Sequence, residues 1–163
     1  MMSFNITEET ENYRLIHEQA EALADDNKWN ITLLANISAL LFLTMKDINW
    51  AGFYLLHGNE LLLGPFQGKP ACTCIPTGKG VCGTAVKENR IMRVEDVHTF
   101  PGHIACDSES ASEIVLPIRC KGQIIGVLDI DSPVKGRFSE KDEEELLGIV
   151  QVIEEHLTED PVL

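Results

Sequence analysis

Cys106 is the residue whose setting in this sequence most favours chemistry. It follows a Pro101-Gly102 turn and lies in a small polar loop that leads into an apolar, β-branched run at residues 114–118. A residue in that position is presented beside the end of a strand. An unpaired cysteine usually behaves as a small buried hydrophobe, so reactivity at Cys106 depends on the groups that can approach it.

Six further residues could supply those groups. Three are cysteines upstream in glycine-rich segments, and three are acidic residues downstream at the ends of expected strands. They are Cys72, Cys74, Cys82, Glu113, Asp129 and Asp131.

The acidic residues are expected to cluster at one end of a sheet. Asp129 and Asp131 are two residues apart near the end of a strand, so both project to the same side. If this strand pairs with residues 114–120 across the turn at 121–122, the two carboxyl groups lie opposite Glu113. Like charges this close raise the pKa of at least one carboxyl group and provide a proton donor near neutral pH. Alternatively, Asp131 only begins a turn, which Asp129 caps.

Three kinds of chemistry fit these side chains. Zinc could be bound by the four cysteines above or by His103 with Cys106, but the paired C-x2–4-C knuckles of structural zinc sites are missing. Cys106 could be an acyl-transfer nucleophile with His98 or His103 as its base, although no cysteine-protease signature surrounds it. In thiol redox chemistry, a loop cysteine is oxidised to sulfenic acid and captured by a resolving thiol as a disulfide. Spacing alone does not name that pair.

Trp50 and Tyr54 could form one wall of a small pocket. They are four residues apart on an expected strand and therefore share a face. Aromatic residues in this arrangement usually belong to a core, but two of them can also line a pocket in which the tyrosine hydroxyl reaches a ligand. Gly52 between them indicates the close approach of another backbone.

Composition limits the functions that this chain can have. Its 163 residues are 44% hydrophobic and 24% charged, which is typical of a globular domain with its own core. The 13 basic and 26 acidic residues give a formal charge of −13, which repels nucleic acid and anionic membranes alike.

We find neither a secretory signal nor an apolar run long enough to span a bilayer, so we expect a cytoplasmic protein. In that reducing compartment, the five cysteines favour a transient disulfide.

Changes in hydrophobic period divide the chain into expected helices and strands. Helices are expected at 7–24, 31–45, 80–89 and after Ser139, and strands at 48–56, 61–66, 91–94, 114–120 and 123–130. A capping box of Ser139 and Asp142 starts the last helix. Its predicted inward residues are Leu146, Leu147, Val150 and Ile153. Hairpins flanked by helices predict one α+β domain over residues 1–163, built on an antiparallel sheet, with an N-terminal helical segment at about 1–28.

Six longer motifs carry a family resemblance. They are Asn49-Trp-Ala-Gly-Phe-Tyr54, Gly64-Pro-Phe-Gln-Gly68, Gly78-Lys-Gly-Val-Cys-Gly-Thr-Ala85, His103-Ile-Ala-Cys106-Asp, Ser112-Glu-Ile-Val-Leu-Pro117 and Gly126-Val-Leu-Asp-Ile-Asp-Ser132. These motifs resemble those of the free methionine-(R)-sulfoxide reductases, which are single GAF-domain enzymes. The resemblance extends from about residue 31 to residue 150. It implies a GAF domain whose central antiparallel sheet has the N- and C-terminal helices packed on one face.

The resemblance implies a role for each cysteine. Cys106 is at the position of the attacking thiol, and Cys72 is at the position of the main resolving thiol. Cys82 is at the position of a further redox cysteine that can join the relay. Cys74 and Cys120 lie outside the family's cysteine pattern.

The resemblance also implies how the substrate is held. Glu113, Asp129 and Asp131 are at the positions of the substrate-binding and polarising carboxylates, and Asp129 would hold the ammonium group. Trp50 and Tyr54 match the aromatic wall that receives the methyl end of the substrate.

The implied reaction reduces free L-methionine-(R)-sulfoxide to L-methionine with neither a cofactor nor a metal. Cys106 attacks the sulfoxide sulfur and is left as sulfenic acid, while a protonated carboxyl group, Glu113 with Asp131, polarises the S–O bond. Cys72 or Cys82 then closes a disulfide, which a thioredoxin-type reductant reopens. The resemblance further implies a homodimer. The alternative is a GAF-type sensor of a small molecule or of redox state, without turnover.

Overall fold

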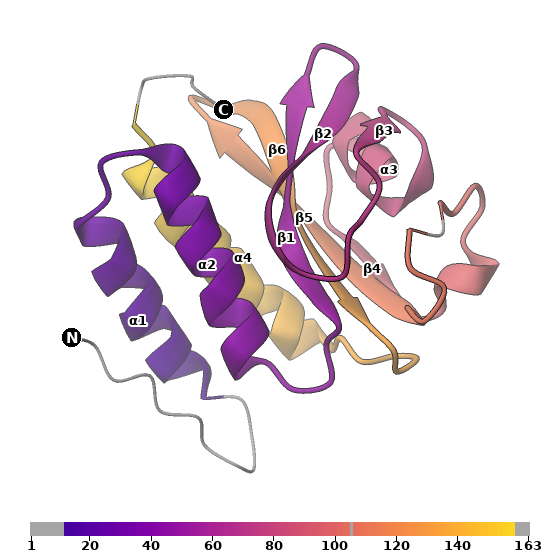
Figure 1. Cartoon of the computed structure of the whole chain (residues 1–163), viewed down its shortest axis with the longest axis horizontal. Helices are drawn as coiled ribbons and strands as arrows, with labels where there is room; N and C mark the ends of the chain where they lie inside the picture. Colours follow the sequence, from indigo (N-terminus) through magenta and orange to yellow (C-terminus); the bar gives the residue numbers. More distant parts are fainter. Residues whose placement is uncertain (1–11, 105, 159–163) are drawn as a thin grey trace.

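A six-stranded antiparallel sheet lies at the centre of the fold (Figure 1). The structure is a computed structural model that describes residues 12–104 and 106–158. The strands are β1 Trp50–His57, β2 Glu60–Gly68, β3 Cys74–Pro76, β4 Met92–Val94, β5 Ser112–Cys120 and β6 Gln123–Ser132. Their order across the sheet is β3-β2-β1-β6-β5-β4, and all neighbouring pairs are antiparallel. The predicted α+β class is confirmed.

Helices cover both faces of this sheet. They are α1 Tyr13–Asp25, α2 Asn30–Thr44, α3 Gly80–Glu88 and α4 Glu140–His156, with a short 3-10 turn at Val97–Thr99. On one face, α2 and α4 lie against the strands and α1 packs on both of them; α3 lies on the opposite face (Figure 1). The N- and C-terminal helices therefore share one face, as the family resemblance implies.

The alternation of side chains along the strands separates two apolar cores. Phe53 on β1 and Leu128 on β6 belong to the core under α1, α2 and α4. Tyr54 and Val127, their direct neighbours in sequence, belong to the smaller core under α3. Because the period of a strand is two residues, the large core dictates which side chains are left to face α3.

Most expected elements are present, with two differences in the strands and the first helix. The strand β3 lies inside the segment 67–80 that was expected to be a loop; it is a three-residue edge strand, too short for its own alternation to be recognised. The first helix begins at Tyr13, and the expected residues 7–11 lie outside the described part of the chain.

The prediction that Leu147 faces inward is wrong. Its side chain is 37% exposed, whereas Leu146, Ile149, Val150 and Ile153 are buried. These four residues follow the i, i+3, i+4, i+7 spacing of one helix face, and Leu147 lies about 100° further round the helix. Phe42 on α2 is likewise 38% exposed, although its spacing from Leu34, Ser38 and Leu41 in the sequence favours the same helix face.

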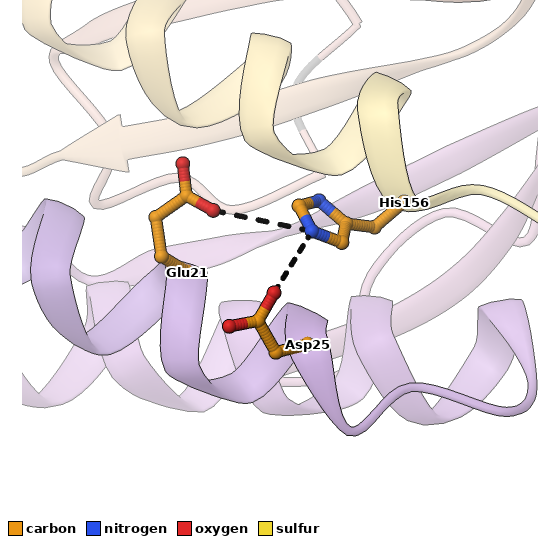
Figure 2. Close-up of side chains that lie close together, drawn as sticks. All are labelled: Glu21, Asp25 and His156. Carbon is orange, nitrogen blue, oxygen red and sulfur yellow. Dashed lines mark hydrogen bonds and ion pairs between the residues drawn. The ribbon is translucent and has the colours of Figure 1, made fainter.

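Among the described residues, three sets of polar contacts hold α4 against α1, and one of them joins His17 Nε2 to Glu145 Oε2 at 3.2 Å. At one end, His156 of α4 lies between two acidic residues of α1 (Figure 2), with Nε2 at 3.3 Å from Asp25 Oδ1 and 4.0 Å from Glu21 Oε2. The other ring nitrogen is 2.8 Å from the carbonyl oxygen of Val152. This carbonyl group, together with the carboxylates, raises the pKa of His156. The protonated ring donates from Nδ1 to the carbonyl oxygen of Val152 in α4 and from Nε2 to Asp25 in α1.

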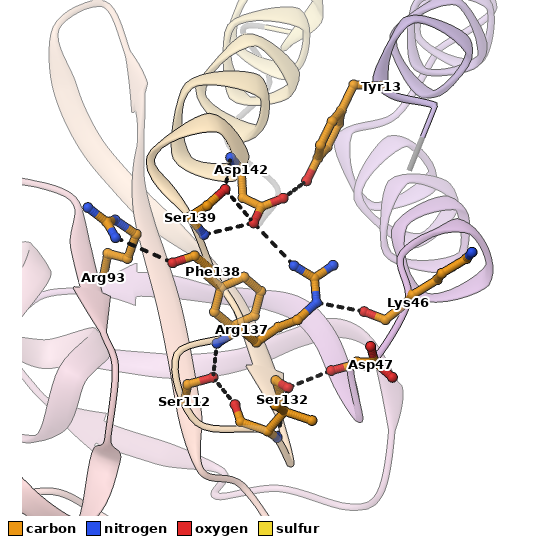
Figure 3. A network of polar contacts seen from close by, with 11 residues as sticks. Tyr13, Lys46, Asp47, Arg93, Ser112, Ser132, Arg137, Phe138, Ser139 and Asp142 are labelled. Carbon is orange, nitrogen blue, oxygen red and sulfur yellow. Dashed lines mark hydrogen bonds and ion pairs between the residues drawn. The ribbon is translucent and has the colours of Figure 1, made fainter. Parts of the chain in front are cut away.

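Asp142 is the centre of the second set of contacts (Figure 3). Its carboxylate accepts from the hydroxyl group of Tyr13, from Arg137 Nη1 at 3.1 Å and from the backbone N–H of Ser139 at 2.8 Å. The predicted capping box is confirmed, because Ser139 Oγ accepts from the backbone N–H of Asp142. Burial alone would raise the pKa of Asp142, but these hydrogen bonds, with the charge of Arg137, lower it.

We predict that Asp142→Ala destabilises the fold by about 3–5 kcal/mol, because it removes a buried ion-pair partner and a helix cap together. Chemical denaturation near neutral pH measures the change. Glu144→Ala is the matched control, since Glu144 is exposed on the same helix and should change stability by less than about 0.5 kcal/mol. Equal stabilities of the two variants would show that the network contributes little.

Candidate active site

The carboxyl groups predicted to cluster do lie together, in a row across three strands. Trp50 on β1 is directly opposite Asp131 on β6, which is directly opposite Glu113 on β5. Asp129 is two residues before Asp131 and opposite Gly52, in the adjacent row. The predicted pairing of the last two strands is therefore confirmed, and the alternative that Asp131 only begins a turn is wrong.

Hydroxyl groups next to this row fix the strand ends. Ser112 pairs with Ser132 in the register, directly beside Glu113 and Asp131. Ser112 Oγ donates to Val134 O at 2.5 Å and Ser132 Oγ donates to the carbonyl oxygen of Asp47 (Figure 3). The acidic side chains are consequently carried by a rigid part of the sheet.

Helix α3 brings Cys82 onto the acidic row. Its side chain is buried, and Sγ lies 3.8 Å from Glu113 Oε1. The next residue is Gly83, where a Cβ atom would come within 2.5 Å of the carbonyl oxygen of Pro76. Glycine at that position lets the first turn of α3 approach β3 closely, which places Cys82 over the sheet.

A disulfide joins the two long loops above the carboxyl groups. It links Cys72 to Cys106, whose Cα atoms are 5.4 Å apart. Both residues are half-buried, while Cys74 is exposed on β3 and Cys120 lies at the far end of β5. The pair is the one that the family resemblance implies, although the two residues are 34 positions apart in the sequence.

The two aromatic rings predicted to share a face do stack, and a third ring, outside the cavity lining, continues the stack. The rings of Trp50 and Tyr54 stack at 5.9 Å between centroids, and Phe66 of β2 stacks on Trp50 at 5.2 Å. Phe66 was missed, although its place opposite Gly52 in the hairpin could have indicated it. The Tyr54 hydroxyl donates to the carbonyl oxygen of Cys72 at 2.8 Å, so it holds the disulfide loop.

Most of these groups line one cavity of about 40 Å³, whereas Cys72 and Phe66 lie outside its lining. The lining includes Cys106, Cys82, the three carboxyl groups and the aromatic pair, with Lys69 and His103 at its edge. His98, weighed as a base for Cys106, is not part of this lining; its Nδ1 lies 2.9 Å from Asp96 Oδ1. The four thiols considered for zinc do not converge either, because two form the disulfide and Cys74 is exposed outside the cavity.

Comparison with known proteins decides between the families that share this fold. The GAF domain model matches residues 31–157. The free methionine-R-sulfoxide reductase of Escherichia coli K12 is 56% identical over 148 residues, which are 91% of this chain and 90% of that protein. The reduced form of the Staphylococcus aureus enzyme, fRMsr, has a TM-score of 0.89 at 54% identity and covers 97% of this chain and 100% of its own. This chain belongs to the free methionine-R-sulfoxide reductase family.

A relative with its substrate bound shares the same architecture. The free methionine-R-sulfoxide reductase of Neisseria meningitidis, solved in complex with its substrate, has a TM-score of 0.91 at 39% identity and covers 96% of this chain and 95% of its own. This chain therefore shares its sheet and helices with a relative that was solved with its substrate bound.

The electrostatics of this family member favour neutral acids in the free site. Burial, and then the neighbouring carboxyl groups, raise the pKa of Glu113 well above its usual value, and they do the same for Asp131. Burial also raises the pKa of Asp129, to about 6, and that of the Cys82 thiol. At neutral pH the cluster therefore retains protons, which makes a proton donor available beside Cys106.

We predict that Glu113→Gln stabilises the free protein and flattens the dependence of its stability on pH. A carboxyl group whose pKa is raised by folding binds its proton more tightly in the folded state. Stability then falls as the pH rises from the unfolded value of about 4.3 towards the raised folded value. At about pH 8 the variant should be more stable by roughly 1–3 kcal/mol.

Denaturant titrations of the disulfide form between about pH 5 and pH 8 measure this difference. Glu144→Gln, an exposed substitution on α4, is the control and should follow the wild type. Parallel curves for the wild type and Glu113→Gln would show that Glu113 ionises as readily in the folded chain as in the unfolded one.

Proposed function

We propose that this chain reduces free methionine-R-sulfoxide to methionine. The observation that carries the proposal is the Cys72–Cys106 disulfide, which lies directly over a buried row of carboxyl groups with raised pKa values. A thiol that alternates with a disulfide supplies two electrons, and the acids supply the proton that a poor leaving oxygen requires. The identity to reductases of this name over nine tenths of the chain gives independent support.

Cys106 is the attacking residue in the proposed reaction. Its thiolate attacks the sulfoxide sulfur while protonated Glu113, assisted by Asp131, donates to the sulfoxide oxygen. The S–O bond breaks, the oxygen ends on Cys106 as sulfenic acid, and methionine leaves. The Cys72 thiol then displaces the hydroxyl group as water and forms the observed disulfide.

The remaining pocket residues position the substrate. Ionised Asp129 pairs with the ammonium group, since hydrogen-bonded charge pairs are strong in a confined site. Trp50 and Tyr54 contact the methyl end. A methionine inside a polypeptide continues at both ends and does not fit a pocket closed by two loops, so the free amino acid is the substrate.

The disulfide form represents the end of the cycle. The bond joins the two loops that carry Cys72 and Cys106 above the cavity, and its reduction releases them before the next substrate binds. Both cysteines are half-buried, which leaves the bond accessible to a thioredoxin-type dithiol.

The proposal also includes a cytoplasmic location, a homodimer and a single domain. Reversible disulfide chemistry requires a reducing compartment, which supports a cytoplasmic protein; no helix in the described residues is long and apolar enough to cross a membrane. Exposed apolar side chains on and beside α2, namely Trp29, Phe42 and Leu43, support a homodimer. The packing of α1 on α2 and α4 supports one domain for the whole chain.

The direct test is turnover of racemic free methionine sulfoxide with dithiothreitol as the reductant. We predict that the wild type consumes only the R epimer and stops near half conversion. Cys106→Ser should lower the rate by at least about 10³-fold, because the nucleophile is lost. Cys74→Ser, whose substitution lies outside the cavity, should keep the wild-type rate. If the wild type releases no methionine, a GAF-type sensor explains the acidic pocket better.

The disulfide pair predicts which thiol resolves the sulfenic acid first. With a thioredoxin system as the reductant, Cys72→Ser should release about one methionine per chain and then stall, because sulfenic acid persists on Cys106. Cys82→Ser should still form the Cys72–Cys106 bond, which mass spectrometry of the oxidised protein detects. Stalling of Cys82→Ser instead, with turnover by Cys72→Ser, would reverse the order of the two thiols.

A further inference from the structure

Cys82, Glu113 and Asp129 form a cluster of potential metal ligands at the bottom of the cavity. One ligand atom from each residue, the thiol sulfur and two carboxyl oxygens, lies within 4.8 Å of both others. All three side chains are buried, and all three line the cavity that opens between the two loops. They come from α3, β5 and β6, so their proximity depends on the fold and does not follow from any spacing in the sequence.

One ligand atom in this cluster lacks a partner. Asp129 is 5% exposed, and its Oδ1 atom has no hydrogen-bond partner among the described residues. A buried carboxyl oxygen without a donor is costly. This oxygen faces the cluster and is open to a positively charged group that enters the cavity.

We propose that Cys82, Glu113 and Asp129 form a binding site for a borderline divalent cation of the Zn²⁺ type. One thiolate and two carboxylate oxygens are ligands that Zn²⁺ accepts, at Zn–S of about 2.3 Å and Zn–O of about 2.0 Å. Tetrahedral coordination at those bond lengths separates sulfur from oxygen by about 3.5 Å, close to the 3.8 Å between Cys82 Sγ and Glu113 Oε1. The cavity leaves room for water as a fourth ligand.

The charge around the cluster favours a cation. Asp131 adds a third carboxyl group to the lining, and the ammonium group of Lys69 at the edge is paired with Glu109 at 2.5 Å.

The surface cluster of Glu21, Asp25 and His156 (Figure 2) lacks these features. Its two acidic side chains are 48% and 77% exposed, and both are within 4.0 Å of the imidazole of His156. No buried oxygen is left unpaired there, and the ion pairs account for the arrangement.

Occupancy of the buried site has a consequence for the proposed function. The cation would use the two acidic residues assigned above to the substrate and would hold the Cys82 thiol as thiolate. Zn²⁺ would then compete with methionine sulfoxide and withhold Cys82 from disulfide exchange. Binding itself does not depend on turnover, so it is measured on protein without substrate.

The test uses the disulfide form of a Cys74→Ser, Cys120→Ser background, in which Cys82 is the single free thiol. Titration with Co²⁺, a spectroscopic substitute for Zn²⁺, should produce a thiolate-to-cobalt charge-transfer band that added Zn²⁺ abolishes. Mg²⁺ and Ca²⁺ should not abolish it, because they require oxygen ligands. Absence of the band in this background would overturn the proposal.

Three variants in this background assign the ligands. Cys82→Ser should lose the band and bind Zn²⁺ at least about tenfold more weakly, since loss even of a residue supporting a ligand costs about 10–100-fold. Asp129→Asn, which keeps the shape of the side chain, should keep the band at saturation but require more metal. Glu144→Gln, exposed on α4 and outside the cavity lining, is the control and should match the background. Equal Zn²⁺ affinity in all of these proteins would overturn the proposal.

Discussion

The register between β1, β6 and β5 is the constraint on which the site depends. The core under α1, α2 and α4 requires Phe53, Leu128 and Leu116 on one face of the sheet. Because a slip of one residue would move every side chain of a strand to the other face, the large core also fixes what lies under α3. The acidic row and the aromatic wall are thus positioned by apolar packing on the opposite side of the sheet.

The acidic row itself opposes folding. Carboxyl groups with raised pKa values lower the stability of the chain in the pH range where they would ionise when unfolded, and Asp129 has an oxygen without a partner among the described residues. The large apolar core and the buried contacts of Asp142 with Tyr13 and Arg137 offset this cost. Function and stability are therefore in opposition on the two faces of one sheet.

The parts of the fold that follow from local patterns of hydrophobic residues and helix caps could be predicted from the sequence. The alternation on β5 and β6, with the short turn between them, predicted that Asp129 and Asp131 lie opposite residues near Glu113, and the capping box predicted the start of α4. It was insufficient where tertiary contacts decide. β3 is too short to show a period, Leu147 faces solvent because a neighbouring residue better matches the helix face, and Phe66 depends on hairpin register.

The cysteine pair of the disulfide also could not be predicted from sequence spacing. No spacing rule selects Cys72 over Cys74 as the partner of Cys106, because the two are only two residues apart in the sequence. Only resemblance to a family named the pair before the fold was known. The cluster of Cys82 with Glu113 and Asp129 shows the same difficulty, since its members come from three separate elements.

The aromatic wall connects two properties that are usually discussed apart. Tyr54 holds the carbonyl oxygen of Cys72, and Trp50 Nε1 donates to the carbonyl oxygen of Lys69 at 3.1 Å. The two side chains proposed to contact the substrate therefore also anchor the loop that carries Cys72. A substitution at either position would change the pocket wall and the support of the disulfide together.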